Sequence, residues 1–105
     1  MSSKMSQVFY YVPEDGDDME TQNCFTIRGI SQADLRLSDI HENFPLPGQY
    51  HFRFQYLYMG KVTVWLDLSS ETAKLPQVDN MIVIKALRLS YFEQRGPPTK
   101  LVSAE

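Results

Sequence analysis

The sequence has little cysteine, no long hydrophobic run and no excess of positive charge. Its one cysteine, Cys24, excludes a disulfide within the chain. No segment approaches the roughly 18 apolar residues that a membrane-spanning helix requires, so we expect no membrane span. Ten Lys and Arg against thirteen Asp and Glu give a net charge of -3. That balance provides no general attraction to phosphate backbones, and we expect no nucleic-acid partner.

The start of the chain also lacks a targeting pattern. Residues 1–7, MSSKMSQ, contain no apolar core of a signal peptide, so we expect a cytoplasmic protein. The chain has 105 residues, of which 43% are hydrophobic and 22% are charged. This length and composition are typical of one globular domain.

Motifs for catalysis and ligand binding are missing as well. The five glycines are scattered, and none belongs to a phosphate-binding loop. His41 and His51 have no spacing that would bind zinc or serve a nucleophile. Cys24, a lone cysteine within a predicted strand, would ordinarily be a small buried residue. The acidic run at residues 14–20 lacks the ligand ladder of an EF-hand and is better explained as a solvated loop. We therefore expect no enzyme, no metal and no cofactor.

Several segments have the alternation, or the β-branched and aromatic composition, of strands. The first two flank the acidic run and would form a hairpin, and the third and fourth would be joined by a turn at Met59-Gly60. The last is apolar from its start and would be a central strand. These segments are residues 7–12, 23–29, 50–58, 60–68 and 81–92.

Between the second and third strands the apolar period changes to that of a helix. The residues at this spacing are Leu35, Leu37, Ile40 and Phe44. Ser38 is a suitable N-cap, and the Pro and Gly residues at 45–48 would stop the helix. The pattern predicts one short helix.

The element order β, β, α, β, β, β predicts an α+β fold. One helix would cover a five-stranded mixed sheet, as in ubiquitin-like folds. We expect the domain to span residues 7–92, after a disordered N-terminus at 1–6 and before a flexible tail at 93–105.

The fourth strand places a tryptophan outside the core. Val62, Val64, Leu66 and Leu68 alternate with Thr63, Trp65 and Asp67, so Trp65 lies on the polar face. A large aromatic residue outside the core often marks an interface. The alternative is that a loop or the tail covers it.

Charge is also segregated along the chain. The acidic run follows the first strand, whereas several basic residues lie around the last two strands: Lys61, Lys74, Lys85 and Arg88. This polarity suits head-to-tail pairing of copies, although scattered solvated charges would give the same pattern. The open strand edges of a mixed sheet are templates for β-addition.

Four segments resemble the DIX domains of dishevelled, axin and dixin. LRLSDIHENF is similar to the family's helix-start signature, and SSETAKLP is similar to its acidic stretch that ends in Ala, a basic residue, Leu and Pro. MIVIKAL and VFYYV resemble the strand that follows and the opening strand. The resemblance covers residues 7–89.

The resemblance implies a ubiquitin-like domain that polymerises head to tail, with the strand-two edge of one copy on the strand-four edge of the next. Heterologous contacts of this kind give open filaments when the rotation does not close. On strand four the implied contact residues are Lys61, Thr63, Val64, Trp65 and Asp67; on strand two and the helix they are Asn23, Cys24, Phe25 and Ile40.

Two positions depart from the family pattern. Trp65 stands where animal members often have lysine, and Asn23 where they often have tyrosine. The aromatic residue of the contact would then lie on strand four instead of strand two, and the chain would be a divergent member of the family.

The function implied is a non-enzymatic self-association domain whose reversible filaments scaffold signalling complexes by avidity. It would act in the cytoplasm, in puncta or in polarised membrane-associated assemblies, with itself and other DIX-domain proteins as partners. The alternative is a monomeric ubiquitin-like module of the PB1 or Ras-association type, in which the acidic run at residues 14–20 binds a different protein.

Overall fold

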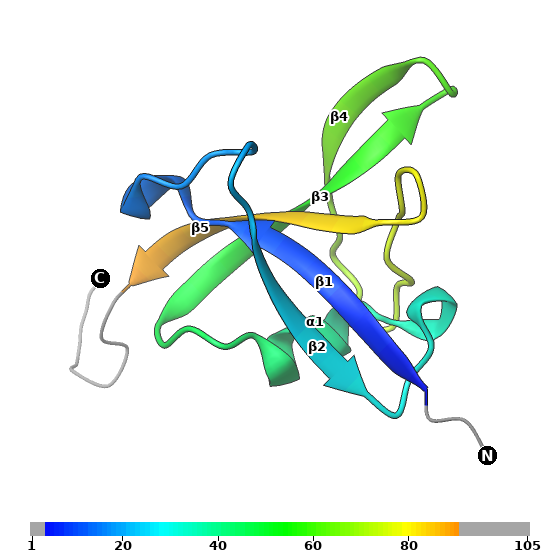
Figure 1. Ribbon diagram of the computed structural model, residues 1–105, viewed down its shortest axis with the longest axis horizontal. Coiled ribbons are helices and arrows are strands. Elements are labelled where there is room, and N and C mark those ends of the chain that lie inside the picture. Colours follow the sequence, from blue (N-terminus) through cyan, green and yellow to red (C-terminus); the bar gives the residue numbers. More distant parts are fainter. Residues whose placement is uncertain (1–3, 91–105) are drawn as a thin grey trace.

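Five strands and one α-helix form the part of the chain that the computed structural model describes, residues 4–90 (Figure 1). In chain order they are β1 (Met5–Tyr11), β2 (Asn23–Arg28), α1 (Leu37–Asn43), β3 (Gln49–Tyr58), β4 (Val62–Asp67) and β5 (Ile82–Ser90). Two short 3-10 turns, η1 (Pro13–Asp15) and η2 (Gln32–Asp34), lie in the connections. The predicted α+β architecture is confirmed. The predicted tail at 93–105 lies outside the described residues.

The strands form one mixed sheet in the order β2-β1-β5-β3-β4. β1 pairs with β5 in parallel, and the other neighbours are antiparallel. The predicted hairpin of the first two strands is present, and the last strand is central. On β5, Ile82, Ile84 and Val83 are all almost fully buried, although Val83 faces away from the other two. Burial on both faces explains the continuous apolar run in this strand.

The core lies between the sheet and α1. One face of the sheet provides Val8, Phe54 and Ile84, and the segment around α1 provides Leu35 and Ile40, all nearly inaccessible to solvent. We call this face the helix side and the opposite face the open face. An aromatic cluster closes the helix side, because the Phe44 ring lies within 4.8–5.9 Å of four other rings. Edge-to-face rings at such distances add to the stabilisation from burial.

The helix begins differently from the prediction. Its N-cap is Arg36 and not Ser38, and the Asp39 carboxylate accepts the Arg36 backbone N–H at 2.8 Å. The first-turn N–H groups of Leu37 and Ser38 donate to the backbone carbonyls of residues 73 and 71, both at 3.0 Å. A neighbouring segment therefore satisfies the groups that an N-cap side chain would otherwise bind. Leu35, predicted as helical, is extended and precedes the helix.

The β3–β4 hairpin turns at Met59-Gly60, as predicted. Both residues have positive φ, 51° and 69°, and the Lys61 N–H donates to the Tyr58 carbonyl at 3.0 Å. The pairing of β3 with β4 continues to Tyr58–Val62, whereas its pairing with β5 ends at Phe54–Ile84. The hairpin therefore projects beyond the body of the domain (Figure 1). For this reason Val62, expected on a buried face, is 55% exposed.

Candidate interaction edges

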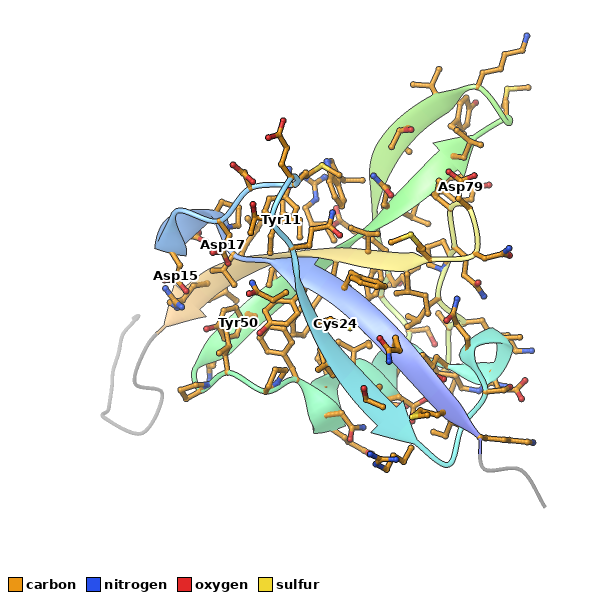
Figure 2. All side chains as sticks on the ribbon, viewed as in Figure 1. Tyr11, Asp15, Asp17, Cys24, Tyr50 and Asp79 are labelled. Carbon is orange, nitrogen blue, oxygen red and sulfur yellow. The ribbon has the colours of Figure 1, made fainter. Side chains whose placement is uncertain are left out.

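The acidic loop between β1 and β2 is held in place by contacts within the domain. Asp15 forms a bidentate ion pair with Arg88 of β5, with N–O distances of 2.7 and 2.8 Å. Arg88 also donates to the Tyr50 hydroxyl at 3.1 Å, so Asp15 and Tyr50 lie at the same end of β5 (Figure 2). Hydrogen bonding to Arg88 lowers the pKa of Asp15. The sequence pattern grouped Arg88 with the basic residues around the last two strands. In the structure it binds residues of its own domain.

Two further acidic residues shape the same loop. Asp17 accepts hydrogen bonds from the Val12 backbone N–H and the Asn23 side-chain amide, at 3.1 and 3.0 Å. Asp18 accepts the backbone N–H groups of Glu20 and Thr21, at 3.0 and 3.1 Å, in an Asx-type turn. Within residues 4–90, no group of three or more His, Cys, Asp or Glu side chains could hold a metal ion. These carboxylates fix the conformation of the loop that leads into β2.

On the β2 edge the predicted contact residues differ in exposure. Asn23 and Cys24 are exposed. The Cys24 thiol (Figure 2) lies 3.1 Å from the Gln7 side-chain oxygen. The expectation of a buried Cys24 is therefore wrong. Phe25 is half-buried, with its ring centroid 5.7 Å from that of Tyr10. Ile40 has no solvent exposure and belongs to the core, so its side chain cannot reach a neighbouring copy in this conformation.

On the β4 edge, Lys61, Thr63 and Asp67 are exposed, and Val64 and Trp65 are half-buried. Asp67 accepts hydrogen bonds from His51 at 2.9 Å and from Arg53 at 3.1 Å, and these bonds lower its pKa. Its charge is thus partly compensated within the domain. The Thr63 side chain is exposed on the open face of β4. Among residues 4–90 it has no polar partner.

Trp65 lies on the open face, on the side that the alternation predicted. Its ring centroid is 6.0 Å from that of Tyr11, and the Lys85 ammonium lies 4.6 Å from the ring centroid. Tyr11 is only 7% exposed, so Trp65 and Lys85 help to cover it. The indole therefore stabilises its own sheet through packing and a cation–π contact. Only the remaining exposed part of the ring is available to a partner.

The two histidines each lie beside a carboxylate. His41 of α1 is 2.9 Å from Glu71, and His51 of β3 is 2.9 Å from Asp67. Both imidazoles are about half exposed, at 44% and 47%. They belong to separate exposed pairs, and neither lies beside Cys24 in a hydrogen-bonded pair among residues 4–90.

Comparison with known proteins identifies the domain type. The family model of the DIX domain matches residues 5–86, which include every strand except the end of β5. No curated protein gives a significant match. Within residues 4–90, no helix has the length and apolar character needed to cross a membrane.

The contacts of Trp65 predict that its removal destabilises the domain. We expect Trp65→Ala to lower the free energy of unfolding by about 2 kcal/mol, because a half-buried indole and its ring contact are lost. Thr63→Ala, on the same face of β4, should change it by less than about 0.5 kcal/mol. Urea denaturation of both variants measures the difference. Equal stability of the two variants would show that the Tyr11 and Lys85 contacts do not stabilise the sheet.

The Asp15–Arg88 ion pair predicts a dependence of stability on pH. The pKa of Asp15 is lowered from 3.8 in the folded state, so its stabilisation is present above that value and is lost as the pH falls through the lower folded pKa. We expect Asp15→Asn to be less stable than wild type at pH 7, with a difference that shrinks below about pH 4. Urea midpoints across this pH range measure the effect. Glu14→Gln, an exposed position of the same turn, is the control, and an equal response in both variants would contradict the assignment.

Proposed function

Because the chain belongs to the DIX domain family, a family of protein-interaction domains, we propose that it associates with itself head to tail. The β4 edge of one copy is the head, and the β2 edge of the next copy is the tail. The contact continues the sheet from one domain to the next by strand addition.

The order of the strands supports this proposal most directly. Among residues 4–90, β1, β5 and β3 are each paired on both sides, whereas β2 and β4 are each paired on one side only. The two edges lie at opposite ends of one sheet, and both strands have six residues. An edge presents backbone N–H and C=O groups that can pair with another strand. Because head and tail are different surfaces, each added copy leaves a new free edge, which gives an open chain when the rotation does not close.

Exposure defines the residues of the proposed contact. The head consists of Lys61, Thr63 and Asp67 with the exposed parts of Val64 and Trp65, and the tail consists of Asn23 and Cys24 with the exposed edge of Phe25. Ile40 is omitted because it is buried. The backbone groups of the two edges provide the pairing, and these side chains determine its strength and selectivity.

Weak contacts would suit a reversible scaffold. A micromolar dissociation constant corresponds to about 8 kcal/mol per contact, so copies would assemble only where their local concentration is raised. An assembled filament would then present many copies of whatever is attached to the domain, and avidity would replace single-site affinity. We propose that the domain scaffolds signalling complexes in this way in the cytoplasm, and that other DIX domains join through the same edges.

The alternative, a monomeric module that uses its acidic run to bind a basic partner, is less well supported by the loop. Asp15 is paired with Arg88, and Asp17 and Asp18 accept backbone hydrogen bonds. These three carboxylates are therefore already engaged within the domain, which leaves Glu14 and Glu20 as the acidic side chains most available to a basic partner.

Two variants, one on each edge, test the proposal. Thr63→Lys on β4 and Thr26→Lys on β2 place a positive charge at exposed positions of the open face. Each should weaken self-association at least tenfold, because a charge enclosed at the contact loses solvation. Sedimentation velocity from micromolar to millimolar concentration measures the size of the assemblies, and urea denaturation confirms that the variants remain folded.

Mixing the two variants gives a result that only head-to-tail contact predicts. Each variant keeps one intact edge, so the mixture should form a dimer that cannot grow, whereas each variant alone stays monomeric. A wild type that is monomeric at every concentration would contradict self-association. Filaments unaffected by both variants would show that the copies meet through a different surface.

A further inference from the structure

The β3–β4 hairpin has an apolar surface that lies outside the core. Nine large hydrophobic residues are exposed among those described, and five of them are on this hairpin: Tyr56, Leu57, Tyr58, Met59 and Val62. We call these five residues the hairpin tip. Met59 is 75% exposed, and Tyr58 and Val62 are each 55% exposed. The tip projects from the body of the domain because β3 and β4 continue beyond their pairing with β5 (Figure 1).

Turn geometry does not explain the methionine at the tip. Met59 has a φ of 51° and is followed by Gly60 with a φ of 69°. A turn with two successive residues of positive φ favours Asn-Gly or Asp-Gly, because Asn and Asp tolerate the left-handed conformation better than other residues with a side chain. An exposed methionine at this position departs from the local rule, and such departures are most common at functional positions.

Three residues of the tip lie on one face of the sheet, together with Val64 of β4. Tyr56 pairs with Val64 and Tyr58 pairs with Val62, in the same alternation as the buried Phe54. These four side chains therefore continue the helix side of the sheet past the core. Between Arg53 and Asp67 the hairpin has no acidic residue, and Lys61 is its one charged residue.

The tip is continuous with the proposed head, because Val62 is also the first residue of the edge strand β4. A copy that adds its β2 edge to β4 must lie beside the tip. Both copies have the same handedness, so the direction of pairing fixes where their α1 helices lie. If β4 pairs antiparallel with β2, both helices lie on one side of the joined sheet. If the two strands pair in parallel, the helices lie on opposite sides.

The two orientations bring the tip against different surfaces. With the helices on one side, the tip lies beside the helix side of the neighbour near the end of β2, where the half-buried Ile30 packs against the core. With the helices on opposite sides, it lies beside the open face of β2, which presents Cys24, Thr26 and Arg28. Apolar contact favours the first orientation. The like charges of Lys61 and Arg28 oppose it only weakly, because both side chains are exposed.

We propose that the hairpin tip is a second part of the head and packs against the helix side of a second copy beside Ile30, with β4 antiparallel to the β2 of that copy. This inference rests on the proposed self-association and adds the side-chain surface that determines its strength. It also sets the register in which the open-face residues Asp67, Trp65 and Thr63 lie opposite Cys24, Thr26 and Arg28.

Met59→Asn separates the role of the tip in association from its role in folding. Asparagine suits the turn and should stabilise the folded domain, while the loss of apolar contact should weaken self-association about tenfold. Leu89→Asn, at a position that is 66% exposed on the central strand β5, is the matched control and should leave association unchanged. Sedimentation velocity and thermal denaturation give the two readouts.

Unchanged association of Met59→Asn would overturn the role of the tip, even where Thr63→Lys abolishes assembly and so supports the edges. A second overturning result would be that Met59→Asn reduces binding to vesicles of phosphatidylcholine and phosphatidylserine without any effect on self-association. The occupant of the tip would then be a lipid surface and not a second copy.

The single native cysteine reports the orientation. In the proposed register, Asp67→Cys places a second thiol opposite Cys24 of the neighbour, so mild oxidation should give a ladder of disulfide-linked copies. Val62→Cys, on the helix side of β4, should give no more linkage than wild type. Preferential linkage of Val62→Cys would overturn the antiparallel orientation but keep the edge contact. Linkage of neither variant above wild type would contradict both the orientation and the proposed function.

Discussion

The pairing of β5 between β1 and β3 is the constraint on which the rest of the structure depends. β1–β2 and β3–β4 are local hairpins, and β5 joins them into one sheet through a parallel pairing on one side and an antiparallel pairing on the other. The burial of Ile82, Val83 and Ile84 on both faces of β5 fixes this central position. Because β5 occupies the middle, the two hairpins place β2 and β4 at opposite edges. The surfaces proposed for self-association therefore follow from the core and not from the edge residues themselves.

The same arrangement gives the hairpins different surroundings. The β1–β2 loop is tied to the end of β5 through Asp15 and Arg88, whereas the tip of the β3–β4 hairpin extends beyond β5 and keeps its apolar side chains exposed. A fixed tail and a projecting head differ in shape and in chemistry. Such a difference favours heterologous contacts over two-fold symmetric ones, since a symmetric contact would use the same patch on both copies.

Sequence reasoning located the strands and the helix because alternation and apolar period are local properties. The turn at Met59-Gly60 and the open-face position of Trp65 followed from the same local patterns. The helix start could not be predicted, because the backbone of residues 71 and 73 binds the first-turn amides, and this contact depends on the tertiary fold. The exposure of Cys24 depends on the edge position of β2, and the complete burial of Ile40 depends on the packing of α1 against the sheet. The pattern of a single element specifies neither.

Of the proposed contact, the sequence predicted the strands but not the roles of all their residues. The resemblance to DIX domains pointed to strands two and four, and the structure makes both of them edges. Trp65 has a partly internal role that its sequence position did not reveal, because its partners Tyr11 and Lys85 come from two other strands. The hairpin tip was not predicted, since its exposure arises from the difference between the lengths of the β3–β4 and β3–β5 pairings.

Amide hydrogen exchange at dilute and concentrated protein tests the central claim most directly. An added strand protects the outward N–H groups of the strand that it joins. The account predicts that raising the concentration slows exchange in both β2 and β4, while β1, β5 and β3 exchange at unchanged rates. Equal exchange at the two concentrations, or new protection confined to other elements, would contradict the claim that these two edges join copies of the chain.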